Sequence, residues 1–149
     1  MFKKMNNREV KLFLSLVFQE AEEALKGELL FLFNKGKISE RVLAEYFPVQ
    51  YSEAKAYLGK KRLFDKNNYL LCYALDQGCK LCKINSFKAE TFAGKTVKKL
   101  YVSCDVGTVE VQAGELLGPV NLGDVVLVKG DTAVFKLSQK EITQLNKVL

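Results

Sequence analysis

Apolar residues recur at helical spacing along the first third of the chain. Between residues 7 and 34 they follow steps of three and four, at Val10, Phe13, Leu14, Val17, Ala21, Ala24 and Leu25. This spacing predicts helix over residues 7–34, interrupted near Gly27. A short apolar segment from Glu28 to Phe33 then ends at Asn34–Gly36, which can form a left-handed cap.

Three further apolar residues, Leu12, Leu16 and Phe18, widen the apolar face of the first helix. Two explanations stay open: burial within the helix's own domain, and packing against a second copy of the chain. Because a water-exposed apolar face costs free energy, we expect a homodimer that forms through the N-terminal helix.

The pattern of residues 36–61 predicts two short helices, the second of which carries Lys55, Lys60 and Lys61. Ser39 can cap a helix that extends to Phe47, Pro48 stops this helix, and Ser52 can cap the second one. Each helix has one apolar side, which makes a compact core feasible with Ile38, Val42, Leu43, Tyr46 and Phe47 from the first, Ala54, Tyr57 and Leu58 from the second, and Leu29 and Leu32.

Two strand-like runs follow these helices. Arg62–Asp65 and Tyr69–Tyr73 flank Lys66-Asn67-Asn68, and paired asparagines tolerate the positive φ of a tight hairpin. Two helices followed by a hairpin resemble the winged helix-turn-helix superfamily, over residues 36–73 only. The resemblance implies nucleic-acid binding without a target sequence, because the superfamily has no invariant base-reading signature.

If the second helix is a recognition helix, its polar side contacts double-stranded DNA. The groove-facing set is then Ser52, Lys55 and Lys60, with Gln50 and Tyr51 in the turn before the helix. The residues that meet phosphates are Arg41, Lys61, Arg62 and Lys66. The alternative is that these side chains form an ordinary solvated face or a protein-binding surface.

Beyond Ala74 the pattern changes to short β-prone runs separated by glycines, over residues 80–84, 97–104, 108–113, 125–129 and 132–137. Gly130-Asp131 joins the clearest hairpin, and Ser138 can cap a closing helix over residues 139–149. We therefore predict an α+β fold. A helical, winged-helix-like domain occupies residues 1–76, and a small, mainly antiparallel β-rich domain with a C-terminal helix occupies residues 77–149.

The charge favours a polyanionic partner mildly. The 149 residues include 23 Lys and Arg against 17 Asp and Glu, a net charge of +6. Residues 1–70 contain 13 basic and 9 acidic residues, and residues 71–149 contain 10 and 8. The excess therefore leans toward the predicted winged-helix domain.

The chain contains no histidine. This excludes His-based acid–base catalysis, Ser-His and Cys-His nucleophile pairs, and His-ligated zinc. No pair of carboxylates has a recognisable catalytic spacing, so we expect neither enzyme activity nor a cofactor. Residues 89–96, Ala-Glu-Thr-Phe-Ala-Gly-Lys-Thr, fit a permissive phosphate-loop pattern, but residues 97–104 predict a strand where a phosphate loop requires a helix.

The four cysteines are Cys72, Cys79, Cys82 and Cys104. Cys79 and Cys82 have the spacing of a zinc knuckle, which Cys72 and Cys104 could complete as a four-thiolate site. The lack of a second close pair favours small core residues instead. We expect reduced thiols rather than a disulfide framework, and the sequence leaves metal binding undecided.

Leu12–Phe18 is a short apolar run that leads directly into acidic residues, which argues against a secretory signal. No run approaches the roughly 20 apolar residues that span a bilayer. We therefore expect a cytoplasmic, non-catalytic DNA-binding protein, either a dimeric transcriptional regulator or an accessory factor. The alternative is a winged-helix scaffold for protein–protein interaction that binds no nucleic acid and docks through its β-rich half.

Overall fold

The computed structural model describes residues 4–60, 69–105 and 107–148. These residues form a mixed α+β fold that divides into two compact units, Met1–Tyr73 and Ala74–Leu149. We call them the helical unit and the barrel unit. The division falls within helix α5 (Tyr69–Asp76).

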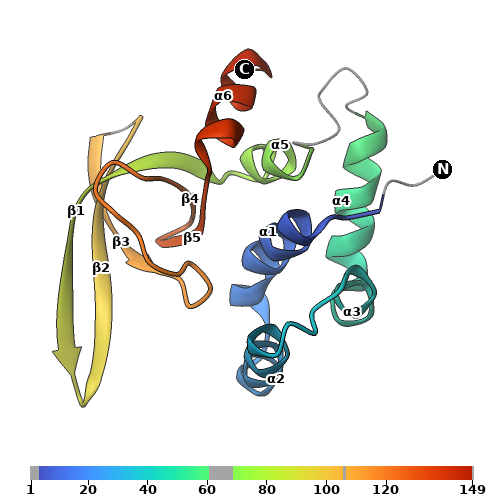
Figure 1. The fold of residues 1–149 in the computed structure, drawn as a ribbon, viewed down its shortest axis with the longest axis horizontal. Helices are drawn as coiled ribbons and strands as arrows, with labels where there is room; N and C mark the ends of the chain where they lie inside the picture. The colour runs from blue at the N-terminus through green and yellow to red at the C-terminus, as the bar shows by residue number, and fades with distance from the viewer. Residues whose placement is uncertain (1–3, 61–68, 106, 149) are drawn as a thin grey trace. The chain divides into compact units, whose positions relative to one another are not determined.

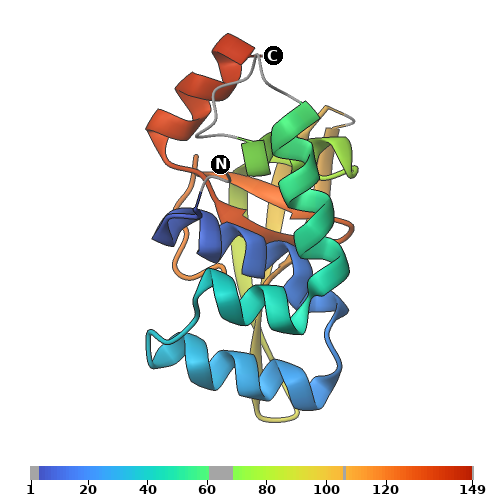
Figure 2. The same cartoon turned by 90° about the vertical axis from the view of Figure 1, so that its right-hand side faces the viewer.

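The helical unit contains α1 (Asn7–Val17), the 3-10 turn η1 (Phe18–Glu20), α2 (Glu23–Asn34), α3 (Glu40–Tyr46) and α4 (Pro48–Lys60). Figure 1 shows these elements in colours from blue to green. In Figure 2, α3 lies between α1 above it and α2 below it, and α4 runs steeply beside α1 and α3. The arrangement is a small helical bundle in which α3 contacts both α1 and α4.

The ends of α1 and α2 follow from local chemistry. Asn6 and Glu9 form a capping box at the start of α1, in which each side chain accepts a hydrogen bond from the other residue's N–H. The helix predicted over residues 7–34 is interrupted at residues 21–22 rather than near Gly27, which lies inside α2. The polar run from Gln19 to Glu23 breaks the apolar stripe there, whereas a single glycine costs a helix only about 1 kcal/mol.

The predicted left-handed cap at the end of α2 is confirmed. Gly36 has φ +68°, its N–H donates to the Phe33 carbonyl over 3.0 Å, and the Lys37 N–H donates to the Leu32 carbonyl over 2.9 Å. These two hydrogen bonds define a Schellman motif.

The two helices predicted over residues 36–61 are present as far as Lys60, the last described residue there, with one correction. Ser39 caps α3 through the Val42 N–H, as predicted. However, α4 begins at Pro48, so Ser52 lies inside the helix and does not cap it. Proline is suited to the first position of a helix because its missing N–H would have no partner there.

The second strand of the predicted wing is a helix. Residues 69–73 belong to α5, and the other predicted strand, residues 62–65, lies outside the described residues. Residues 69–74 form a continuous apolar run that is buried throughout. The periodicity of so short an apolar run does not distinguish a buried strand from a buried helix. The hairpin that suggested a winged helix is therefore wrong in its second half.

The barrel unit contains five strands and a closing helix: β1 (Lys80–Phe92), β2 (Lys95–Cys104), β3 (Gly107–Ala113), β4 (Val125–Lys129), β5 (Thr132–Lys136) and α6 (Gln139–Val148). The strands close in the order β1-β2-β3-β5-β4, with β3 and β5 parallel and the other neighbours antiparallel. This Greek-key order encloses an apolar core that includes Ile84, Leu100, Val102, Val111 and Val126.

Most sequence predictions for this unit are confirmed. The five β-prone runs are strands, Gly130-Asp131 joins β4 to β5, and Ser138 caps α6 in a reciprocal capping box with Glu141. The five strands close into a barrel, which is more specific than the small, mainly antiparallel β-rich domain that the sequence predicts. Strand β1 is also far longer than the predicted run, because it continues past the core to Phe92.

Candidate nucleic-acid interface

Two of the predicted recognition residues, Tyr51 and Lys55, face Glu40 of α3. Lys55 Nζ lies 2.8 Å from Glu40 Oε2, and the Tyr51 hydroxyl donates a hydrogen bond to the same oxygen. The Tyr51 ring also packs edge-on against Phe13 of α1, with ring centroids 6.1 Å apart. These contacts connect α1, α3 and α4, so both side chains are engaged inside the helical unit.

The electrostatics of this cluster favour an ionised Glu40. Burial alone would raise the pKa of Glu40, but hydrogen bonds from Lys55, Tyr51 and the Met5 N–H outweigh burial and lower it. Burial, together with the hydrogen bond to Glu40, raises the pKa of Tyr51 to about 12. The cluster is a partly buried ion pair with a neutral phenol, an arrangement that stabilises the contact between α3 and α4.

The remaining predicted residues do not gather on one basic face among the described residues. Gln50 Nε2 donates to Glu20 Oε2 over 3.4 Å, and Arg41 pairs with Glu45 on α3. Ser52 is exposed on α4. The side chain of Lys60, and Lys61, Arg62 and Lys66 entirely, lie outside the described part of the chain.

A stronger concentration of positive charge lies in β1 and β2. Residues 80–104, which we call the basic ribbon, contain six lysines and one acidic residue, Glu90, a net charge of +5. The lysines are Lys80, Lys83, Lys88, Lys95, Lys98 and Lys99. The net charge of the whole chain is +6. The net charge of this one hairpin is therefore almost as large as that of the whole chain.

A β-bulge divides β1 into two parts. Ile84 pairs with Val102 and Ser86 with Tyr101, which leaves Asn85 as the extra residue on β1. Before the bulge, residues 80–83 pair with β4; beyond it, β1 pairs only with β2 among the described strands. Bulges bend a strand and increase its twist. Figure 1 shows β1 and β2 continuing together past the other three strands.

The cross-strand register assigns the ribbon's side chains to two faces. Lys88 opposes Lys99 on the face that continues the barrel exterior, and Glu90 lies on this face too, within 3.5 Å of Lys88 and 3.3 Å of Lys99. Glu110 of β3 contacts Lys99 as well, at 3.4 Å. The hydrogen bonds that Lys99 donates to Glu90 and Glu110 raise the pKa of Lys99, which keeps it positively charged.

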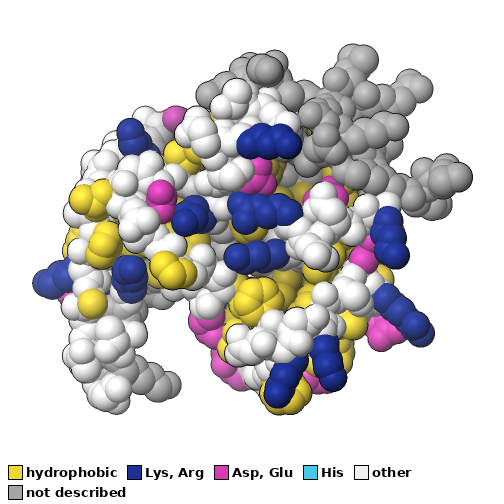
Figure 3. All heavy atoms as spheres, in the orientation of Figure 1, with side chains coloured by type: hydrophobic (Ala, Val, Ile, Leu, Met, Phe, Trp, Pro, Cys, Tyr) yellow, Lys and Arg dark blue, Asp and Glu magenta, His cyan; other side chains and the backbone are white. Residues whose placement is uncertain are grey.

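The opposite face of the ribbon presents an aromatic ring. Phe87 opposes the buried Leu100 but is itself 44% exposed, because the barrel core ends at this level. Lys98 Nζ lies 4.5 Å from the centre of the Phe87 ring, in cation–π geometry. In Figure 3, Lys and Arg side chains are interspersed with hydrophobic ones over the part of the surface where β1–β3 lie.

The basic ribbon also accounts for the apparent phosphate-loop motif. Residues 89–92 end β1, Ala93-Gly94 form the turn, and Lys95 begins β2. The motif therefore joins two antiparallel strands, as the strand predicted over residues 97–104 already indicated. A phosphate loop instead joins a strand to a helix.

The cysteines require a correction. Cys82 of β1 and Cys104 of β2 form a disulfide at the base of the basic ribbon, whereas reduced thiols were expected. Cys72 and Cys79 are not in a disulfide and are buried; burial raises the pKa of the Cys79 thiol despite the opposing effect of Lys129. Within the described residues, no group of three His, Cys, Asp or Glu side chains is placed to hold a metal ion.

The charge of the basic ribbon is hidden in the sequence when charge is averaged over half of the chain. Outside residues 80–104, the segment 71–149 contains four lysines and seven acidic residues, which offset most of the ribbon's excess. A shorter window would have found the signal.

Comparison of the chain with known proteins identifies no similar protein. No family model, curated protein or solved structure matches the chain. In the described part of the chain, no helix has the length and apolar character needed to cross a membrane.

Proposed function

We propose that the protein binds DNA without catalysis, and that the basic ribbon rather than α4 is its principal contact surface. The observation that carries the proposal is the net charge of +5 within residues 80–104, on two strands that continue past the barrel. Lysines in such numbers supply the phosphate contacts that dominate DNA affinity.

The shape of the ribbon favours duplex DNA. The major groove of B-DNA admits a two-stranded β-ribbon as well as an α-helix. Among the described residues, Lys80 and Lys83 are exposed and form no ion pair, while Lys88 and Lys99 have only the shared Glu90 and Glu110 as counterions. These lysines are therefore available for phosphates at little cost.

A second candidate, single-stranded nucleic acid, is favoured by Phe87. Proteins that bind single strands combine basic grooves with exposed aromatic rings on which bases stack, each ring contributing about 1–3 kcal/mol. Substitution of one residue, Phe87, distinguishes the two candidate ligands. Phe87→Ala should weaken binding of a single strand by roughly tenfold or more and leave duplex affinity nearly unchanged.

If the protein acts as a dimeric transcriptional regulator, its two copies must associate through a surface other than the apolar face of α1. Leu12, Leu16 and Phe18 are 3%, 8% and 1% exposed, so that no second copy is required to cover them. Light scattering at micromolar concentration would distinguish the 16.8 kDa chain from a homodimer.

The experiment that tests DNA binding is a salt titration of a fluorescent duplex followed by anisotropy. The proposal predicts an affinity that falls steeply with salt, since each neutralised phosphate contributes about −0.9 to the slope of log K against log[salt]. The rival, a protein-interaction scaffold, predicts no measurable duplex affinity at low salt for the folded protein. That result would overturn the proposal.

A further inference from the structure

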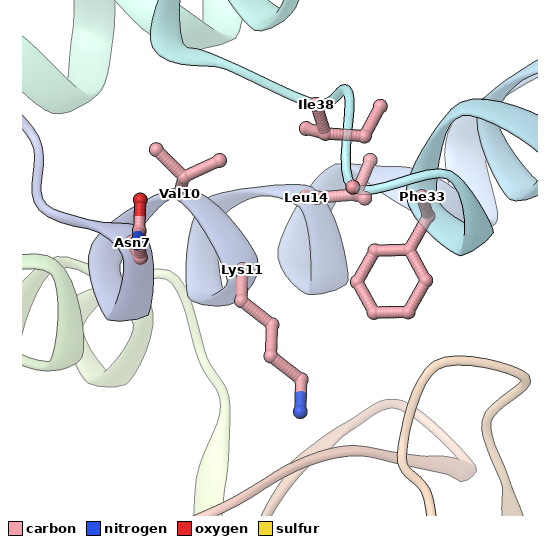
Figure 4. A pocket seen from close by; sticks show the side chains of 7 residues that line it. Asn7, Val10, Lys11, Leu14, Phe33 and Ile38 are labelled. Carbon is pink, nitrogen blue, oxygen red and sulfur yellow. The ribbon is translucent and has the colours of Figure 1, made fainter.

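The helical unit contains a pocket of about 240 Å³ between α1, the end of α2 and the segment before α3. Val10, Leu14, Phe33 and Ile38 form its apolar lining, and Asn7 and Lys11 supply the polar groups. Figure 4 shows Lys11 and Phe33 extending to the same side, with Leu14 between their bases. One ammonium group therefore lies beside a hollow that polar and apolar groups line together.

The charges around the pocket are nearly all positive. The two segments that line it, residues 7–14 and 33–38, contain Arg8, Lys11, Lys35 and Lys37. Their one carboxylate, Glu9, is 4% exposed and is held by the Asn6 N–H at the start of α1. Lys11 forms no ion pair with any described residue. The site therefore selects an anion rather than a cation or a neutral polar molecule.

The geometry points to a medium-chain carboxylate as the ligand: we propose that its acyl chain contacts Val10, Phe33 and Ile38 and that its carboxylate pairs with Lys11. Ligand pockets for drug-sized molecules occupy about 300–1,000 Å³, so this smaller pocket suits a ligand of about ten non-hydrogen atoms. Octanoate has that size. A charge-assisted hydrogen bond to an ammonium beside apolar surface is stronger than one in open water.

The test exploits the absence of tryptophan from the chain. Phe33→Trp introduces the chain's single tryptophan into the pocket lining, and sodium octanoate is titrated below its micellar concentration. We expect a saturable change in emission. 1-Octanol, which has the same chain without the charge, should bind at least about tenfold more weakly.

Matched variants in the Phe33→Trp background separate the role of Lys11 from net charge. Lys11→Met should weaken octanoate binding at least about tenfold. Lys140→Met removes the same charge from the exposed surface of α6 in the barrel unit and should leave binding unchanged. If Phe33→Trp lacks the far-ultraviolet circular dichroism of the wild type, the Gly36 amide resonance of the wild-type chain reports binding instead.

Three results would overturn the proposal: no saturable response to octanoate by either readout, equal affinity for octanoate and octanol, or equal losses in the Lys11 and Lys140 variants. The proposal does not depend on DNA binding, because none of these measurements includes nucleic acid.

Discussion

Lys55 Nζ and Glu40 Oε2 lie 2.8 Å apart, and the two side chains are only 11% and 15% exposed. A lysine predicted to read DNA is thus the counterion of a partly buried carboxylate. If Lys55 moved away to contact a phosphate, Glu40 would lose its charged partner. Moving Lys55 would therefore cost more free energy than moving an exposed lysine. This ion pair is the reason to look for the DNA-binding surface outside α4.

The ion pair makes a direct prediction for stability. Lys55→Met should lower the free energy of unfolding by about 2–3 kcal/mol, because it leaves a partly buried carboxylate with fewer hydrogen bonds. Arg41→Met is the control, since the Arg41 side chain is 89% exposed and its pair with Glu45 should contribute less than about 0.5 kcal/mol. Urea denaturation measures both. Equal, small losses would show that Lys55 is solvated.

The lowered pKa of Glu40 predicts a loss of stability in acid. A carboxyl whose pKa is lower in the folded state stabilises the fold above its unfolded pKa, near 4.5, and this contribution disappears as pH falls through the lowered folded-state value. Glu40→Gln should therefore be less stable than the wild type at pH 7, and the difference should shrink below about pH 4.5. A difference that stayed constant with pH would contradict an ionised Glu40.

The turn of the basic ribbon contains a conformational cost that can be removed. Phe92 pairs with Lys95 across Ala93 and Gly94, whose φ values of 52° and 78° match a type I′ turn. Alanine is disfavoured at positive φ by about 1 kcal/mol. Ala93→Asn should stabilise the hairpin by about 0.5–1 kcal/mol, and Ala93→Val should destabilise it. Amide hydrogen exchange at Glu90 and Val97, the next hydrogen-bonded pair of the ladder, measures both effects, and the opposite order would refute the turn.

The disulfide predicts a thiol count. Denatured protein kept free of reductant should expose two reactive thiols, Cys72 and Cys79, and reduced protein should expose four. Reduction should also lower the free energy of unfolding by roughly 3 kcal/mol, since Cys82 and Cys104 close a loop of 22 residues. Four reactive thiols before reduction would mean that the pair is not bonded and would return Cys82 to the candidate metal ligands.

Elements whose signals are local could be predicted from the sequence. The hairpin at Gly130-Asp131 and the caps at Ser39, Gly36 and Ser138 depend on a few adjacent residues, and all four are present. Tyr69–Tyr73 could not be assigned in this way, because an apolar run of that length fits a buried helix and a buried strand equally well.

The candidate site was harder to predict because it depends on pairing between distant residues. Nothing in the sequence near Lys55 indicates that Glu40 neutralises it. Equally, the reach of β1 beyond the core is set by its register with β2, where Lys88 opposes Lys99. What the sequence did contain was the lysine density of residues 80–104, which averaging over a larger segment concealed.

The most direct test of the account compares two variants that lose the same charge from different units. One carries Lys83→Ala, Lys88→Ala and Lys98→Ala in the basic ribbon; the other carries Lys35→Ala, Lys37→Ala and Arg41→Ala in the helical unit. Duplex affinity is measured by anisotropy across a salt series. The account predicts that the ribbon variant loses at least about tenfold in affinity and that its salt slope flattens by about one per lost phosphate contact, while the helical-unit variant stays within about threefold of the wild type. Equal losses, or a larger loss in the helical-unit variant, would contradict the assignment of DNA binding to the basic ribbon.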